Sequence, residues 1–97
     1  MRKIEHKMID AIASLKESRK FGETRSFGNT QIERRDNHSA VYLHCNHLAN
    51  VFDDGKVSVN VQTLATWPTN TTISRLRALG VDAARKRYGA FLNGIPV

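Results

Sequence analysis

The pattern of hydrophobic and polar positions predicts that the chain begins with an amphipathic helix. Its first apolar positions recur at steps of four, four and three residues, the spacing of one helix face, over about Lys3 to Ser18. These positions are Ile4, Met8, Ile12 and Leu15. The segment offers no binding residues of its own, so we interpret the apolar face as part of the core and not as a groove for a partner.

Short strands are expected after this helix. Residues 21–28 contain two Phe-Gly steps and are interpreted as a linker. The period then changes to the alternation of strands, interrupted by a turn at Asp36-Asn37-His38 and a hairpin signal at Asp53-Asp54-Gly55. The predicted strands cover residues 30–34, 39–44, 47–52 and 56–61, the last with Val57, Val59 and Val61 facing inward.

The segment around Trp67-Pro68 joins this extended part to a predicted second helix. N-cap residues are available from Thr69 to Thr72, an apolar face follows, and Gly80 is placed to end the helix. The apolar face consists of Ile73, Leu76 and Leu79.

Asn93-Gly94 lies between two apolar pairs and predicts a short terminal hairpin. The predicted fold class is therefore α+β in a single domain over residues 1–97. It comprises an N-terminal amphipathic helix, a small antiparallel β-meander, a second helix and a short C-terminal hairpin.

Composition places the chain among small intracellular proteins. Its 97 residues are 40% hydrophobic, which suits one small folded domain. No apolar run approaches the roughly 20 residues that span a bilayer, so no membrane partner is expected. Cys45 is the single cysteine and cannot form an internal disulfide, which fits a reducing cytoplasm.

Positive charge is concentrated in the carboxyl-terminal half of the chain. The net charge is +6, of which residues 55–97 carry +5. The cations there include Arg75, Arg77 and the run Arg85, Lys86 and Arg87, followed by Tyr88. This charge attracts nucleic acid or an acidic protein surface, although a solvated basic surface is an equally good interpretation.

No pattern of catalytic or metal-binding residues is convincing. His44-Cys45-Asn46-His47 contains zinc-ligand types, but the spacing matches no zinc site and a strand-end turn explains it better. The same residues offer one Cys and a nearby His, but a catalytic cysteine also needs an orienting third group and the sequence shows no pocket, so the pair is weak evidence for catalysis. Asp53-Asp54 precedes Gly55 and predicts a turn in preference to a Mg²⁺ site. We therefore expect neither enzymatic activity nor a cofactor or metal.

Trp67-Pro68 is the best local candidate for a contact site, and it has two interpretations. Trp67 is either the largest anchor of the core, with Pro68 setting the entry to the helix, or an exposed anchor of an interface. An exposed loop from Trp67 to Thr69 would also suit a prolyl isomerase, because X-Pro bonds in flexible chains exchange between cis and trans. The residues alone favour the core interpretation.

Three segments of the chain together resemble small accessory proteins of tailed phages. They are the helix Lys3–Ser18, the segment from Val41-Tyr42-Leu43-His44 to His47-Leu48-Ala49, and the segment from Trp67-Pro68-Thr69 to Arg75-Leu76-Arg77-Ala78-Leu79-Gly80. In length and in the single Trp-Pro joint the chain is most similar to the anti-RecBCD proteins of lambdoid phages. The resemblance covers essentially the full chain but contains no diagnostic motif.

The resemblance implies a specific function. A protein of this family would bind RecBCD, the host helicase–nuclease that degrades linear DNA ends, on its RecC subunit, and would modify its activity in favour of phage DNA. It implies the host cytoplasm as the location and a host peptidyl-prolyl isomerase as a second partner at Pro68. The contact residues expected on physical grounds are Trp67, Pro68, Thr69, Arg75, Arg77, Arg85, Lys86, Arg87 and Tyr88.

The alternative function is that of a small basic nucleic-acid-binding protein. Basic residues beside an aromatic residue, as at Arg85 to Tyr88, are a composition used by single-strand binders. The chain has no phosphate-binding glycine loop and no recognised nucleic-acid motif, so this activity ranks second. No heptad or symmetric pattern defines the oligomeric state, and a homodimer remains open.

Overall fold

The computed structural model describes residues 1–18, 21–86 and 89–97, and these form an α+β fold. The predicted fold class is confirmed. Helix α1 spans Lys3–Ser18, the range that the apolar spacing predicts. Its buried face contacts the three strands that follow it, β1 (Thr24–Phe27), β2 (Thr30–Arg34) and β3 (His38–Leu43). That face comprises Glu5, Met8, Ala11 and Leu15, at the three- and four-residue spacing of one helix side.

Five antiparallel strands form the main sheet in the order β1-β2-β3-β4-β5. Neighbouring strands in the sheet are also neighbours in sequence, so the sheet is a simple meander. No crossover connection is therefore needed between its strands. The strands are β1 (Thr24–Phe27), β2 (Thr30–Arg34), β3 (His38–Leu43), β4 (Asn46–Phe52) and β5 (Val57–Val59).

Two predictions for this sheet were wrong. Residues 21–28 are not only a linker, since Thr24–Phe27 pairs with β2 and Phe27 packs against the core beneath α1. His38 begins β3 and does not belong to the preceding turn, and its ring lies 5.2 Å from that of Phe52 across the strand pair. In both places, pairing with a neighbouring strand outweighs the local turn signal.

A third correction concerns residues 56–61. The alternation of valines predicts one strand with Val61 inward, but β5 ends at Val59 and helix α2 spans Val61–Thr66. Asn60 acts as its N-cap, since its Oδ1 accepts a hydrogen bond from the Thr63 amide at 3.3 Å. Val61 is consequently 44% exposed.

Helix α3 spans Asn70–Ala78 and follows the predicted boundaries closely. Thr69 is its N-cap, Leu79 its C-cap, and Gly80 has the left-handed conformation (φ +87°) that ends many helices. The terminal hairpin at Asn93-Gly94 is also confirmed. It joins β7 (Gly89–Leu92) to β8 (Ile95–Pro96), and β6 (Ala83–Lys86), which was not predicted, completes a three-stranded sheet.

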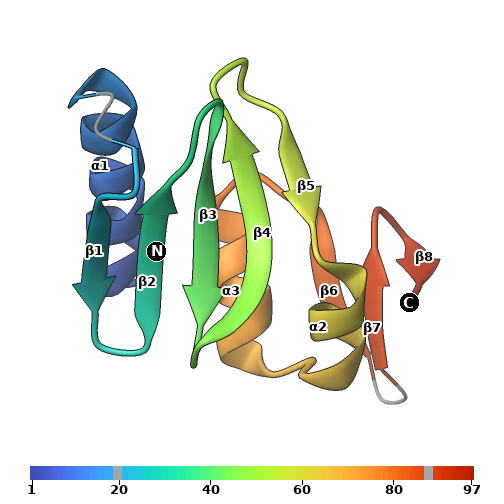
Figure 1. The fold of residues 1–97 in the computed structure, drawn as a ribbon. Helices are drawn as coiled ribbons and strands as arrows, with labels where there is room; N and C mark the ends of the chain where they lie inside the picture. The colour runs from blue at the N-terminus through green and yellow to red at the C-terminus, as the bar shows by residue number, and fades with distance from the viewer. Residues whose placement is uncertain (19–20, 87–88) are drawn as a thin grey trace.

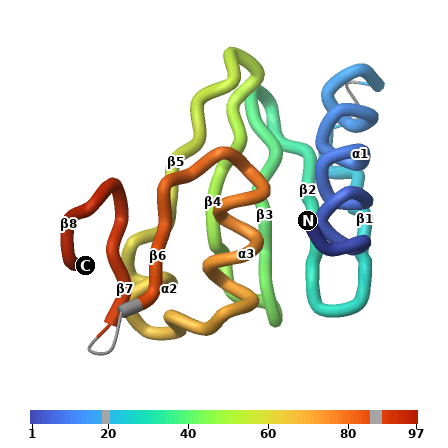
Figure 2. The backbone as a smooth tube through the Cα atoms, turned by 180° about the vertical axis from the view of Figure 1, so that it is seen from behind, coloured from blue at the N-terminus to red at the C-terminus, as the bar shows by residue number. Residues whose placement is uncertain are grey.

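The helices α1 and α3 lie on the same side of the five-stranded sheet, as the two opposite views in Figures 1 and 2 show. Beneath them are two groups of buried apolar residues, one around Met8 and Ile32 under α1, the other around Leu48 and Leu76 near α3. Leu79 packs against both groups and connects them. None of the described helices is long and apolar enough to cross a membrane.

Candidate partner-binding surface

The joint between α2 and α3 is a short, hydrogen-bonded connection. The Trp67 amide donates to the carbonyl oxygen of Thr63 at 2.9 Å, and the Thr69 amide donates to that of Trp67 at 2.8 Å. Thr69 then caps α3, because its Oγ1 accepts from the Thr72 amide at 3.1 Å. The Thr63 hydroxyl donates to the carbonyl oxygen of His47 at 2.7 Å and so ties α2 to strand β4. The backbone around Trp67 is thus fixed on both sides.

Trp67 itself points outward and is 53% exposed. The core interpretation of this residue is therefore wrong; Leu64, one turn earlier in α2, fills the core position and is fully buried. Trp67 borders a pocket of about 290 Å³ between the α2–α3 joint and the β3–β4 turn. The pocket is lined by Leu43, His44, Asn46, Thr63, Trp67, Thr69, Thr71 and Thr72.

The β3–β4 turn on the other side of this pocket has an unusual backbone. His44 and Cys45 both have positive φ, at 50° and 65°, in the two central positions of a two-residue hairpin turn. Asn and Gly are the residues that normally adopt this conformation, because a side chain with Cβ is strained there. The His44 amide is held by the Asn29 carbonyl oxygen at 2.8 Å. The turn thus presents His44 to the pocket, while the neighbouring Cys45 is exposed.

The candidate metal-binding residues of the sequence do not come together as a cluster of three or more in the described structure. No group of three His, Cys, Asp or Glu side chains with metal-binding geometry occurs in the part of the chain that the structure describes. Asp53 instead receives two hydrogen bonds from the buried Arg34 guanidinium, at 2.7 and 2.8 Å, which raise the pKa of Arg34 against the effect of burial. Asp54 accepts from the Lys56 amide at 3.0 Å. The Asp54 carboxylate therefore supports the predicted turn at Gly55, and the Asp53 carboxylate ties this turn to β2.

Arg75, one of the expected contact residues, is only 3% exposed. Its Nη1 donates to Oε2 of Glu5 at 2.6 Å and its Nε donates to the Thr30 hydroxyl at 3.0 Å. The Ser74 hydroxyl donates to the same Glu5 oxygen at 2.5 Å. The guanidinium of Arg75 therefore lies inside the protein and connects α3 to α1 and to β2.

Glu5 stays ionised within this network. Burial by itself raises the pKa of the carboxyl group, but hydrogen bonds from Ser74, the Arg2 amide and Arg75, together with the Arg75 charge, outweigh it and lower the pKa below the usual value of 4.5. The charges of Glu5 and Arg75 thus compensate each other.

Arg77 and Arg85, two other expected contact residues, do not line the pocket at Trp67. Arg77 is exposed, and its Nε donates to the Ala83 carbonyl oxygen at 2.7 Å. Arg85, also exposed, donates to Oδ1 of Asn70 at 3.3 Å. Lys86 is the last residue of β6. The remaining two members of the expected contact set, Arg87 and Tyr88, lie outside the described residues.

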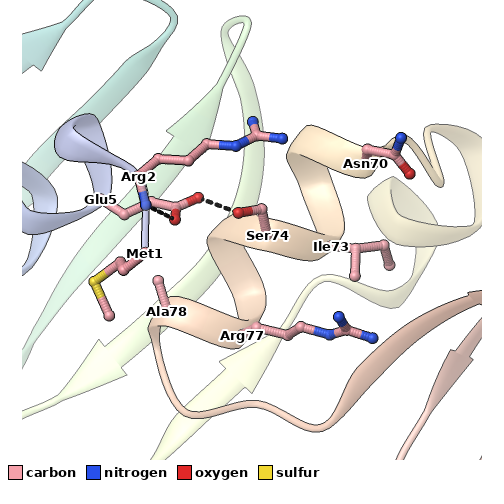
Figure 3. Close-up of a pocket in the computed structure, with 8 residues that line it drawn as sticks. All are labelled: Met1, Arg2, Glu5, Asn70, Ile73, Ser74, Arg77 and Ala78. Atoms are coloured by element: carbon pink, nitrogen blue, oxygen red, sulfur yellow. Dashed lines mark hydrogen bonds between the residues drawn. The ribbon is translucent and has the colours of Figure 1, made fainter.

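Arg77 lines a second, more open pocket of about 550 Å³ at the junction of α1 and α3. In Figure 3 the side chains of Arg2 and Arg77 extend in the same direction along α3. A hydrogen bond between Glu5 and Ser74 lies between them in this view. Arg2 was not among the residues predicted from sequence. Its position depends on the packing of α1 beside α3, for which the sequence contains no signal.

The sequence also missed the polar residues around Trp67. Thr63 lies in helix α2, which was not predicted, and His44 and Asn46 reach the pocket only because the β3–β4 turn is tight. Of the predicted capping segment Thr69-Asn70-Thr71-Thr72 only Thr69 was expected as a contact residue, although all three threonines line the pocket.

Comparison with known proteins gives one match. A family model described as Kyanoviridae Gp96 protein matches residues 1–94. No curated protein and no solved structure matches the chain.

Proposed function

Since the chain belongs to the Kyanoviridae Gp96 protein family and is therefore a phage protein, we propose that it is an accessory protein without catalytic activity that acts by binding a host protein. The observation that carries this proposal is the exposure of Trp67 on a rigid joint beside a pocket. The surface formed by Trp67 and the other residues that line this pocket is called the Trp67 surface below.

The chemistry of the Trp67 surface suits a protein partner. Tryptophan is enriched among the residues that dominate binding energy at protein interfaces, because it buries a large area and has few rotamers. Leu43 gives the pocket a buried apolar lining, and the more exposed Thr69, Thr71 and Asn46 supply polar groups beside it. An apolar centre with a polar rim is the usual arrangement of an interface hot spot.

The partner that we propose is the host RecBCD helicase–nuclease, contacted through its RecC subunit in the host cytoplasm. The support for this choice is the resemblance of the whole chain to the anti-RecBCD proteins of lambdoid phages. Binding would alter the degradation of DNA ends and the recombination activity of the enzyme, so that linear phage DNA survives. The proposed role needs no cofactor.

Affinity capture tests the choice of partner. The wild-type protein, immobilised and exposed to host lysate, should retain RecBCD in stoichiometric amount, and a Trp67→Ala variant should not. Ile95→Ala is a matched control, because Ile95 is another exposed apolar residue, 66% accessible, on β8. If no RecBCD is retained and naked DNA is bound tightly, nucleic-acid binding replaces this function as the main one.

A host peptidyl-prolyl isomerase is the second proposed partner, at Pro68. Pro68 is half-buried between Trp67 and the N-cap of α3, and the Trp67–Pro68 bond is trans. Pro68→Ala should abolish recovery of the isomerase from host lysate, while Pro96→Ala, the change at the other proline, should leave it intact. Equal recovery with both variants would leave Pro68 with only its structural role at the α2–α3 joint.

A further inference from the structure

The arginines of the described regions fall into two groups according to what holds their guanidinium groups. Four are paired with carboxylates, so their charge is compensated locally. These pairs are Arg25–Glu23, Arg34–Asp53, Arg35–Glu33 and Arg75–Glu5. The unbalanced positive charge of the chain must therefore lie elsewhere.

The second group consists of Arg2, Arg77 and Arg85, and no described carboxylate forms an ion pair with any of them. Each is exposed and is held by a neutral oxygen. Arg2 Nη1 donates to the Thr71 hydroxyl at 3.3 Å and Arg85 Nη1 to Asn70 Oδ1 at 3.3 Å. The third guanidinium is oriented by its bond to the Ala83 carbonyl oxygen. Arg2 precedes α1, Arg77 lies in α3 and Arg85 lies in β6, and these three segments meet around α3.

The pocket at the junction of α1 and α3 lies between two of these arginines. Arg2 and Arg77 line it, and Asn70, which holds Arg85, lines it as well. Figure 3 shows Arg2 and Arg77 extending in the same direction, with Ile73 between them in this view. The only acidic residue in the lining is Glu5, whose charge is compensated by the buried Arg75. The pocket is therefore positively charged overall.

We propose that this arginine pocket binds the phosphate groups of a single-stranded nucleic acid. The planar guanidinium fork matches phosphate oxygens in pairs, and each of the three arginines has N–H groups beyond the one that holds it. The three arginines do not line the Trp67 surface, although Thr71 joins the two sites, so phosphate binding by the arginines does not depend on RecBCD binding. The site also differs from the group of basic residues expected from the sequence. It includes Arg2, which was not expected, and it does not include Arg75, which is buried.

A nucleic acid strand fits the surroundings better than an acidic peptide does. Thr71, which holds Arg2, also lines the pocket at Trp67. A strand whose phosphates contact Arg2 and Arg77 can therefore continue toward the exposed Trp67 ring, on which a base can stack. Phosphate contacts combined with an aromatic platform are the arrangement that proteins use for single strands without sequence preference.

Fluorescence anisotropy with a short labelled oligothymidylate and the purified protein tests this proposal. Three phosphate contacts on a single strand predict a slope of about −2 for log K against log salt concentration. Arg2→Gln and Arg85→Gln should each reduce the magnitude of this slope by about 0.7 and weaken binding at low salt by about fivefold. Circular dichroism spectra that match wild type would establish that both variants are folded.

Arg35→Gln is the matched control, because it removes one charge from an exposed arginine that is paired with Glu33 at 3.1 Å. It should leave both affinity and slope unchanged. The proposal is overturned if Arg35→Gln weakens binding as much as Arg2→Gln, or if no saturable binding is seen at low salt. Polyglutamate or anionic vesicles that compete as well as the oligonucleotide at equal charge would equally reject it in favour of an acidic protein or a membrane.

Discussion

Nη1 of Arg75 lies 2.6 Å from Oε2 of Glu5, and both side chains are buried, at 3% and 1% exposure. The two residues are 70 positions apart in sequence and join the first helix to the helix that follows the Trp67 joint. Thr30 and Asn29, beside the β1–β2 turn, also accept hydrogen bonds from Arg75. This ion pair therefore fixes α3, and with it one side of the Trp67 surface, against the N-terminal half of the fold.

Removal of the Glu5 carboxylate should destabilise the protein strongly. Glu5→Ala leaves the Arg75 guanidinium buried without its counter-charge, for which a loss of about 3–5 kcal/mol in the free energy of unfolding is expected. Urea unfolding followed by circular dichroism measures this loss. Glu33→Ala breaks the more exposed pair with Arg35 and should cost less than about 1 kcal/mol. Equal losses for the two variants would contradict a structural role for the buried pair.

Stability should fall at acid pH in a way that depends on Glu5. The pKa of Glu5 is lower in the folded protein than the ordinary value of 4.5 that it regains on unfolding. Its stabilising effect is therefore complete above pH 4.5 and is lost as the pH falls through the lower, folded pKa. Urea unfolding at a series of pH values should show a smaller acid loss for Glu5→Gln than for wild type. Parallel curves for the two proteins would exclude this linkage.

The β3–β4 turn offers a substitution that should stabilise the fold. Cys45 has φ 65°, a conformation that costs a residue with Cβ about 1–2 kcal/mol and glycine very little. After allowance for the greater freedom of glycine in the unfolded chain, Cys45→Gly should raise the free energy of unfolding by about 0.5–1 kcal/mol. Cys45→Ala retains the strained Cβ and should give no such gain. A loss of stability in the glycine variant would show that the Cys45 side chain contributes more than the strain costs.

Much of this fold could be predicted where periodicity and turn chemistry agree. The spacing of Met8 and Leu15 defines α1, and Asp53-Asp54-Gly55 and Asn93-Gly94 define two turns. Helix α2 could not be predicted, because Val57, Val59 and Val61 continue an alternation that the capping side chain of Asn60 interrupts. A local cap here outweighs a longer pattern.

The candidate surface was harder to predict than the fold. The residues alone favoured burial of Trp67, which is exposed, because the fully buried Leu64 that takes the core position lies in the unpredicted helix α2. Arg75 and Arg77 were treated alike, although their positions on α3 bury one and expose the other. The carboxylate that pairs with Arg75 belongs to Glu5, which lies 70 residues away in sequence. Only the tertiary structure shows this contact.

The most direct test of the proposed function is the affinity of purified RecBCD for the wild-type protein and for Trp67→Ala, measured by surface plasmon resonance. Loss of an aromatic anchor at the centre of an interface costs about 2 kcal/mol or more, a rise in Kd of roughly 30-fold. Because Trp67 is 53% exposed, the free energy of unfolding should change by less than about 1 kcal/mol. Tight binding by wild type and this weakening in the variant are expected. Equal affinities, or no binding by wild type, would contradict the proposed binding of RecBCD through Trp67.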